Sequence, residues 1–343
     1  MTSNRDITIY DIAKALNISA STVSRGLKDH PHVRAEIKKK ILATARKLGY
    51  QQNKFASNLR QKNTSTIGVV VPRLDSYFMS TVISGMEKVL NELGYNLIIS
   101  QSQESFKKEA ASIFTMFNSR VDGLLVSLSY ETKNLDHLNV LFNKGIPVVF
   151  FDRICDHPKC KSVVINNYKA GYEATAHLIS QGCKNIIHLG GSLIRNVYNE
   201  RYLGYQRAMR DNGLEENEKS LIISDLSNKA GIEIAKNLLQ QKSLPDGIFA
   251  ANDTSAVSVI CELKQAGIRI PEDVCIAGFN NDPISRVVEP NLTTVHYPGR
   301  EMGEIAANSL ISILKGEQSE FLNSIVISHS LIIRQSSLRK QTA

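Results

Sequence analysis

Net charge divides the chain into two parts of different character. Residues 1–64 hold 13 Lys and Arg against 4 Asp and Glu, a net charge of +9. The remaining residues hold 28 against 29, so the whole excess of +8 lies in the first fifth of the chain. A small basic block beside a near-neutral body is typical of a phosphate-binding module joined to a part that binds another partner. We therefore expect a nucleic-acid-binding front end.

The sequence of residues 1–64 predicts three short helices. A capping box at Thr8 and Asp11 opens the first, over about 8–15. After a turn, Ser19 can cap a second helix, which carries Val23 and Leu27 on one side and the polar Ser21 and Arg25 on the other. The third runs from about Arg34 to Leu48; Gly49 is its stop, and its inward residues are Ile37, Ile41, Leu42, Ala45 and Leu48.

The polar side of the second helix is free to enter a DNA major groove. Arg25 offers a planar fork that suits guanine O6 and N7, while Ser19, Thr22 and Ser24 are short hydroxyls able to meet phosphates. Two alternatives stay open: the module could bind protein instead, and each hydroxyl could simply cap a helix.

Residues 53–60 can form about two helical turns, too few for a stable isolated helix. Phe55 and Leu59 lie at i and i+4, so a partner copy or a DNA minor groove could order the segment. A polar linker with two incidental apolar residues is the alternative.

From Ser65 onward, short apolar runs alternate with amphipathic helical stretches such as Tyr77–Leu93 and Tyr168–Gln181. This alternation predicts an α/β fold with parallel sheets covered by helices, whose ligands collect beyond the carboxyl ends of the strands. The expected strands are Ile67–Val71, Asn96–Ile99, Gly123–Val126, Val148–Phe151, Val163–Ile165, Ile186–Leu189, Leu221–Ile223, Gly247–Ala250 and Val274–Ala277.

Length and composition limit the class of protein. A chain of 343 residues suggests two or three domains, and neither an apolar run of membrane-spanning length nor a leader-like N-terminus is evident, so we expect a cytoplasmic protein. Five cysteines without CxxC spacing argue against a disulfide framework. Cys155, His157 and Cys160 crowd one stretch, but no fourth ligand is evident; we expect no metal and no cofactor.

Several expected strands end in polar residues, among them Ser76, Asp152, Asn252 and Asn280. Any one of them could be a helix cap. Their recurrence favours a cleft with many hydrogen-bonding groups, which suits a sugar-like ligand.

The first sixty residues resemble the headpiece and hinge of the lactose-repressor (LacI/GalR) family of bacterial regulators. The resemblance is carried by TIYDIAK from Thr8, by Ile18-Ser19, by TVSR from Thr22, by LGY from Leu48, and by Asn53 and Leu59. It implies that Leu59 acts as a minor-groove lever; one departure is Gln52, where the family usually has proline. The implied DNA-binding residues, together with the candidates above, are Thr8, Tyr10, Ser19, Ala20, Ser21, Thr22, Ser24, Arg25, His32, Asn53, Phe55 and Leu59.

The body resembles the type I periplasmic-binding-protein fold that the same family uses to sense effectors. Its landmarks are GIPVVFFDR up to Arg153, the stretch from Arg201 to Tyr205, AND up to Asp253, and LTTV from Leu292. Asn280 departs from the Asp of many relatives. The resemblance implies an effector pocket lined by Tyr77, Ser129, Asp152, Arg195, Arg201, Leu226, Asn252 and Asn280.

The resemblance also implies the domain limits. A helix-turn-helix domain covers 1–52, a hinge helix and linker 53–64, an effector-binding and dimerisation domain 65–336, and a tail 337–343. The N-lobe takes about 65–165 and 297–328, and the C-lobe about 166–296 and 329–336. Because the tail lacks a leucine heptad, we expect a homodimer.

The resulting hypothesis is a ligand-responsive transcriptional regulator, a repressor that binds a near-palindromic operator and responds to a sugar or sugar derivative. A sugar-binding or sugar-modifying α/β protein without operator function is the alternative. The motifs of serine hydrolases, phosphate-binding loops and zinc proteases are absent from the sequence, so we expect no enzyme.

Overall fold

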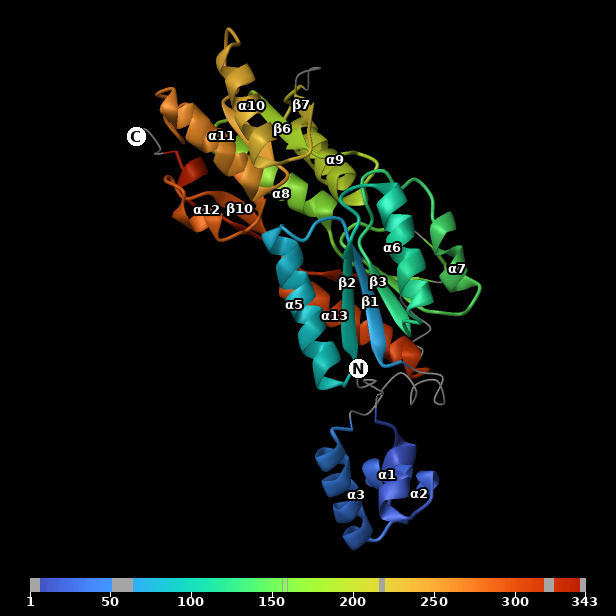
Figure 1. Ribbon diagram of the computed structural model, residues 1–343. Coiled ribbons are helices and arrows are strands. Elements are labelled where there is room, and N and C mark those ends of the chain that lie inside the picture. The colour runs from blue at the N-terminus through green and yellow to red at the C-terminus, as the bar shows by residue number, and fades with distance from the viewer. Residues whose placement is uncertain are drawn as a thin grey trace, which may run out of the picture. The chain divides into compact units, whose positions relative to one another are not determined.

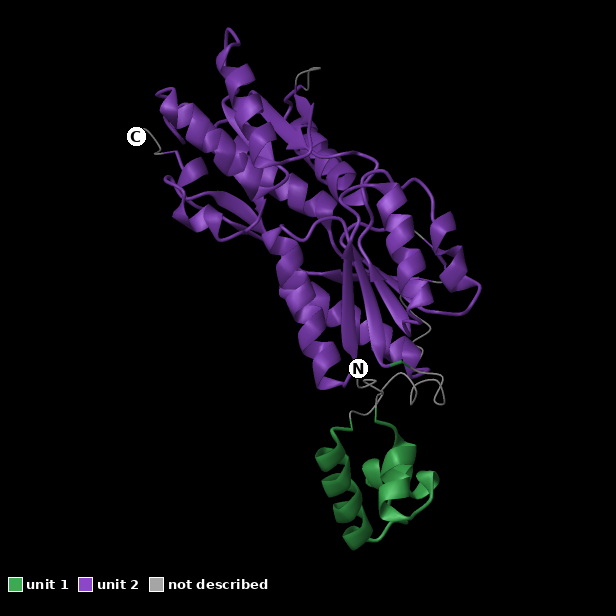
Figure 2. Cartoon of the chain, in the orientation of Figure 1, with its two compact units in different colours: residues 1–64 green, residues 65–343 purple. Residues whose placement is uncertain are grey.

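The computed structural model describes residues 7–50, 64–155, 157–158, 160–215, 220–317 and 324–339. The chain forms two compact units, residues 1–64 and residues 65–343 (Figure 2). The division falls where the net charge of the sequence changes.

The first unit contains the helices α1 (Ile9–Leu16), α2 (Ala20–Leu27) and α3 (Ala35–Leu48). The Asp11 carboxylate accepts hydrogen bonds from the backbone N–H and the hydroxyl of Thr8, as expected of the capping box. Gly49 ends α3 with a φ of 71°, in the left-handed region. The three helices share one core of buried residues: Ile12, Ala13, Val23, Ile41 and Ala45.

One expected inward residue of α3 is wrong. Leu42 is 45% exposed, whereas its neighbour Ile41 is fully buried. Successive helix residues point about 100° apart, so a bundle this small buries one narrow stripe of α3 and leaves Leu42 outside it.

The second unit has two lobes, each built on one six-stranded sheet (Figure 1). The N-lobe sheet has the order β11-β5-β4-β3-β1-β2, and every pairing within it is parallel. Its strands are β1 (Thr66–Val71), β2 (Asn96–Gln101), β3 (Gly123–Val126), β4 (Val148–Phe151), β5 (Lys161–Ile165) and β11 (Ser324–Ile327).

The C-lobe sheet has the order β12-β10-β9-β8-β6-β7 and is parallel except for the antiparallel pair of β10 and β12. Its strands are β6 (Ile186–Gly190), β7 (Leu221–Ile223), β8 (Gly247–Ala250), β9 (Cys275–Asn280), β10 (Thr293–His296) and β12 (Ser330–Ile332). The chain therefore passes between the sheets three times, after β5, after β10 and after β11.

Helices cover both faces of each sheet, which explains why the inner strands are almost continuously apolar (Figure 1). The N-lobe carries α5 (Tyr77–Glu92), α6 (Phe106–Asn118), the short η1 (Asp136–Leu138) and α7 (Asn139–Phe142), and α13 (Gly299–Leu314). The C-lobe carries α8 (Asn167–Ser180), α9 (Asn196–Asp211), α10 (Asn228–Leu239), α11 (Asp253–Gln265), α12 (Ile284–Val287) and the short η2 (Gln335–Ser337).

Glycines bring α5 and α13 into close contact. A Cβ on Gly303 would lie 1.9 Å from the Val82 carbonyl oxygen, and one on Gly85 would lie 2.2 Å from that of Arg300. Each helix thus uses a glycine to admit the backbone of the other, and the pair covers one face of the N-lobe sheet.

The fold class expected from the sequence is confirmed: a helix-turn-helix unit precedes two lobes with parallel sheets. Four strands have the expected limits and five are longer by one or two residues; of these, β9 also begins one residue later than expected, at Cys275. The sequence did not predict the strands β10, β11 and β12. Among the described residues, no helix is both long and apolar enough to cross a membrane.

Candidate functional site

The exposed side of α2 is the candidate DNA-binding surface. Ser21 and Arg25 are exposed on it, opposite the fully buried Val23. The Ser19 hydroxyl lies 2.8 Å from those of Ser21 and Thr22, and it accepts a hydrogen bond from the Thr22 N–H at 3.1 Å. The capping role of Ser19 is therefore present, and three hydroxyls gather where a helix N-terminus favours an anion.

The other candidate DNA-binding residues are spread over the first unit. Thr8 caps α1, and Tyr10 is 67% exposed on it. Ala20 and Ser24 are half-buried on α2, and His32 is exposed between α2 and α3. Asn53, Phe55 and Leu59 lie outside the described residues.

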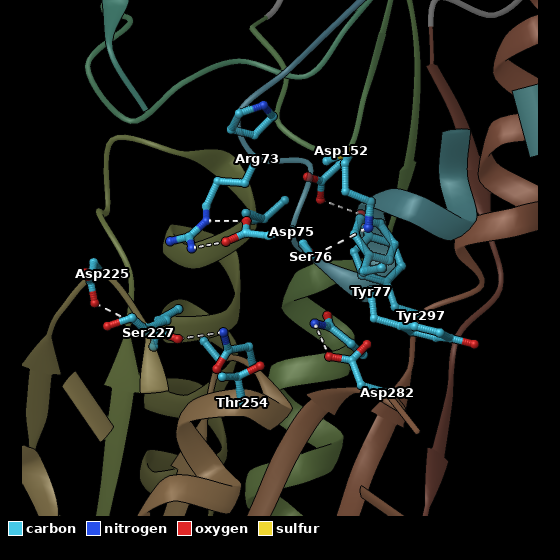
Figure 3. Close-up of a pocket in the computed structure, with 18 of the residues that line it drawn as sticks. Arg73, Asp75, Ser76, Tyr77, Asp152, Asp225, Ser227, Thr254, Asp282 and Tyr297 are labelled. Carbon is cyan, nitrogen blue, oxygen red and sulfur yellow. Dashed lines mark hydrogen bonds and ion pairs between the residues drawn. The ribbon is translucent and has the colours of Figure 1, made fainter. Parts of the chain in front are cut away.

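A cavity of about 560 Å³ lies between the two lobes of the second unit (Figure 3). Its wall combines residues of the N-lobe, such as Arg73, Tyr77 and Asp152, with residues of the C-lobe, such as Asn252 and Asp282. Six of the eight expected effector residues line it: Tyr77, Asp152, Arg201, Leu226, Asn252 and Asn280.

Arg201 lies at the inner wall of the cavity and is only 3% exposed. Its Nε donates to the Asn167 side chain and its Nη1 to the Ala251 carbonyl, both at 2.9 Å. The guanidinium lies 3.5 Å from the centre of the Phe279 ring. Burial lowers the pKa of Arg201. A cation held over a ring in this way can present its remaining donors to hydroxyls or a carboxylate.

Asp152 directly follows β4 and lies in the same wall as Arg201. Its carboxylate accepts hydrogen bonds from Tyr297 at 2.9 Å and from Ser127 at 3.2 Å. Burial raises the pKa of Asp152, while the charges of Arg153 and Arg201 oppose that rise. These two hydrogen bonds fix the orientation of the Asp152 carboxylate, which can also accept a hydrogen bond from a ligand hydroxyl.

Polar contacts at Arg153 connect the lobes beside the cavity. Arg153 pairs with Glu104 at 2.8 Å within the N-lobe and donates to the Tyr198 hydroxyl of the C-lobe at 3.0 Å. Its guanidinium also lies 4.4 Å from the centre of the Tyr130 ring, and Tyr130 donates to Tyr198 at 3.1 Å. A ligand that moves one lobe must therefore change this set of contacts.

Asp282 is the most unusual carboxylate of the wall. It is 7% exposed, and its Oδ1 has no hydrogen-bond partner among the described residues. Burial raises its pKa to about 6. On the other side of the cavity Arg73 and Asp75 form an ion pair at 2.7 Å (Figure 3). Because the Asp282 Oδ1 is itself buried and has no partner among the described residues, ionising Asp282 is costly.

Asn252 shows how a helix cap and a cavity residue can coincide. Its Oδ1 accepts from the Ser255 N–H at 2.9 Å and so caps α11. Its Nδ2 donates to the Leu226 carbonyl, also at 2.9 Å. The cap therefore holds the side chain of Asn252 at the cavity edge.

Two expected effector residues do not line the cavity. Ser129 is buried, and its hydroxyl lies 2.8 Å from that of Thr132. Arg195 is buried too, and its Nη2 donates to the Thr132 carbonyl. Both side chains contact the loop after β3, in which the buried Glu109 accepts from the Ser129 N–H and the Thr132 hydroxyl.

The expected effector set left out several residues of the wall. Arg153 and Asp282 each lie two residues after a strand end, among the polar strand-end residues that favour a cleft, but neither was named as an effector residue. Other polar and aromatic residues of the wall that were not expected include Arg73, Asp75, Glu104, Tyr130, Tyr198, Asp225 and Tyr297. Most of these residues lie on loops or within helices, where no local sequence pattern marks a cavity residue. Only the packing of the two lobes brings them together.

Comparisons with known proteins agree with this architecture. Residues 8–53 match the model of the lacI family of bacterial regulatory proteins, and residues 175–337 match that of a periplasmic binding protein-like domain. The chain is 32% identical to catabolite control protein A of Priestia megaterium, over 96% of this chain and 99% of that one. It is 31% identical to the HTH-type transcriptional repressor PurR of Photobacterium profundum, over 91% of this chain and 93% of that one.

Among solved structures, the chain is similar to the lac repressor dimer bound to operator and the anti-inducer ONPF. The TM-score is 0.88 at 22% identity, with 98% of this chain and 100% of that chain covered. This likeness shows the fold, and the two sequence relatives show the family. The chain belongs to the lacI family of bacterial transcriptional regulators.

Proposed function

We propose that the protein is a transcriptional repressor whose affinity for a near-palindromic operator changes when a small molecule binds between its lobes. The observation that carries this proposal is the joining of a basic helix-turn-helix unit to a separate unit with a cavity walled by both lobes. We expect it to act on its operator in the cytoplasm. The repressor PurR among its relatives supports repression as the outcome.

The ligand class we favour is a sugar or sugar derivative. Sugars present many hydroxyls around a weakly apolar ring, so their sites combine several hydrogen-bonding groups with aromatic surfaces. The cavity offers the charged groups of Asp152, Arg201 and Asp282. It also offers aromatic surfaces: Tyr77, Phe78, Tyr130, Tyr198 and Tyr297.

The coupling to DNA has a definable physical form. A ligand that touches both lobes shifts the balance between lobe arrangements by its difference in affinity for them. Residues 53–60 are too short to form a stable helix alone, so ordering them on DNA costs conformational entropy. A small change in the position of the N-lobes can then decide whether this segment, with Leu59 as lever, orders on the operator.

The operator's symmetry calls for a homodimer, and we propose the β2 edge of the N-lobe as part of its contact surface. The edge strand β2 exposes Ile98 by 38% and Ile99 by 42%, and Phe114 on the adjacent α6 is 58% exposed. An apolar edge strand is a surface that a stable protein covers. Sedimentation equilibrium at micromolar concentration tests the dimer.

A thermal-shift screen of the full chain against sugars and nucleosides tests the ligand proposal. A true effector at 100 times its Kd should add about 2.7 kcal/mol to the free energy of unfolding. Any stabilising sugar should then be recovered unchanged after long incubation, because we propose binding without catalysis. Turnover of the sugar, or stabilisation without any change in DNA affinity, would favour a sugar-modifying or sugar-binding protein instead.

A further inference from the structure

The loop between β4 and β5 carries two cysteines and a histidine that the effector cavity does not use. Cys155, His157 and Cys160 line a second cavity of about 320 Å³, together with Phe150, Pro158, Ser162 and Ser324. Residues of the N-lobe line this cavity. Its two cysteines and its histidine follow Asp152 and Arg153 in the sequence.

The two thiols differ in access, and the imidazole is fixed beside one of them. Cys155 is partly exposed, whereas Cys160 is buried. The Nδ1 of His157 lies 3.5 Å from the Cys160 sulfur, and the His157 ring stacks on Phe142 with 4.5 Å between ring centres. Burial, with a smaller contribution from Cys155, raises the pKa of the Cys160 thiol to about 12.

We propose that Cys155 and Cys160 are a modification site: they form a reversible disulfide by exchange with a low-molecular-weight disulfide. A metal site is not favoured, because no three metal-ligating side chains of the described residues are grouped closely enough to hold an ion. Transient disulfides of this kind are the ones that occur in reducing compartments.

The order of the two steps follows from access. The Cys155 thiolate attacks the small disulfide; one Cys155–S bond forms, the small S–S bond breaks, and the first small thiol leaves. His157 then accepts the proton of Cys160, whose sulfur attacks Cys155 and expels the second small thiol. Two protein thiols are oxidised and one small disulfide is reduced to two thiols, so electrons and protons balance.

The position of the loop gives the modification a route to the rest of the molecule. Asn196 of the C-lobe donates to the Asp152 carbonyl at 3.1 Å and accepts from the Ile154 N–H at 3.0 Å. The new bond would form one residue beyond this contact between the lobes. An effect on ligand binding would rest on the proposed function, whereas the disulfide itself does not.

Peptide mapping of the full chain tests the proposal. The protein is incubated with oxidised glutathione, blocked with N-ethylmaleimide and digested with trypsin, which cleaves after Arg153, Lys159 and Lys161. We expect residues 154–159 and 160–161 to appear as one linked pair that dithiothreitol separates. Glutathione left on Cys155 without linkage, or two alkylated thiols, would overturn the proposal.

Variants separate the roles of the three residues. Cys160→Ser should accumulate glutathione on Cys155, Cys155→Ser should leave Cys160 unmodified, and His157→Asn should slow linkage about 100-fold. Cys261→Ser, which removes the exposed thiol of α11, is the matched control and should not change the linkage. Glutathione on Cys160 in the Cys155→Ser variant would contradict the order of attack. Equal melting temperatures of the reduced variants show that each one folds.

Discussion

At the scale of single residues, Asp282 combines a cost in stability with a place in the cavity wall. Its pKa is raised to about 6 from an ordinary 3.8, so the folded state binds the proton more tightly than the unfolded chain does. Stability therefore falls as the pH rises through 4 to 6. At neutral pH the buried charge costs about 3 kcal/mol, the free energy equivalent to this difference in pKa.

We predict that Asp282→Asn is more stable than the wild type at pH 7.5 and that this difference shrinks as the pH falls to 4. Thermal melts at five pH values check it. Asp225→Asn is the control in the same cavity. Hydrogen bonds from Ser227 lower the pKa of Asp225, so the charged Asp225 stabilises the fold and its replacement by Asn should lower stability at pH 7.5. Parallel pH profiles of the wild type and Asp282→Asn would contradict the account.

A substitution of Arg201 can show whether the planar guanidinium or only its positive charge stabilises the inner wall of the cavity. Lysine keeps the charge, but its single ammonium group cannot reproduce the donor geometry toward Asn167 and Ala251 and the contact over Phe279 together. We predict that Arg201→Lys lowers the free energy of unfolding by about 2 to 3 kcal/mol, the value of hydrogen bonds to a buried charge. Urea unfolding measures it. Arg207→Lys, exposed on the same helix, should unfold like the wild type.

Strand ends predicted one part of the cavity, and the family resemblance added residues such as Arg201, which lies inside α9. Asp152, Asn252 and Asn280 were found from the strand ends. Tyr130 and Tyr198 could not be found, because the two lobes bring them to 3.1 Å although 68 positions separate them in the chain. Ser129 and Arg195 fail for a related reason, since each one bonds to Thr132, a loop residue that the distant Glu109 holds.

At the scale of elements, the contact of α5 with α13 depends on glycine. Alanine is the better helix former by about 1 kcal/mol, so propensity alone predicts that Gly303→Ala is stabilising. Its Cβ would lie 1.9 Å from a backbone oxygen of Val82, which cannot move aside alone. We predict a net loss of about 3 kcal/mol, from overpacking.

Chemical unfolding of Gly303→Ala measures this loss. Asn308→Ala, exposed on the same helix, is the control and should change stability little. A Gly303→Ala variant as stable as the wild type would show that the two helices can separate without cost.

Caps and periodicity predicted the three helices of the first unit, α5, α8 and nine strands, because both signals act within a few residues. The capping box of α1 and the Ser19 cap of α2 are examples. The strands β10, β11 and β12 were missed because they are short and exist through pairing with distant partners, as β11 does with β5. Residues 53–60, where the sequence predicts the hinge, lie outside the described residues, so the hinge stays a prediction.

At the scale of the whole molecule, the excess positive charge of the first unit should govern binding to DNA. We predict that Arg25→Ala weakens binding to a selected operator by about 1 to 3 kcal/mol and relaxes the base preference at one position of each half-site. Effector affinity should not change, because Arg25 belongs to the other compact unit. Competition gel shifts with single-base operator variants check it.

The central claim is that one unit binds operator DNA and that a ligand in the other unit controls this binding. Fluorescence anisotropy of the full chain, on a duplex selected from a random pool and on its scrambled version, tests it directly with and without a stabilising ligand. We expect at least about 1,000-fold preference for the selected duplex and a change in its Kd of about 5- to 150-fold on adding ligand. Equal binding to both duplexes at every salt concentration, with and without ligand, would contradict the account.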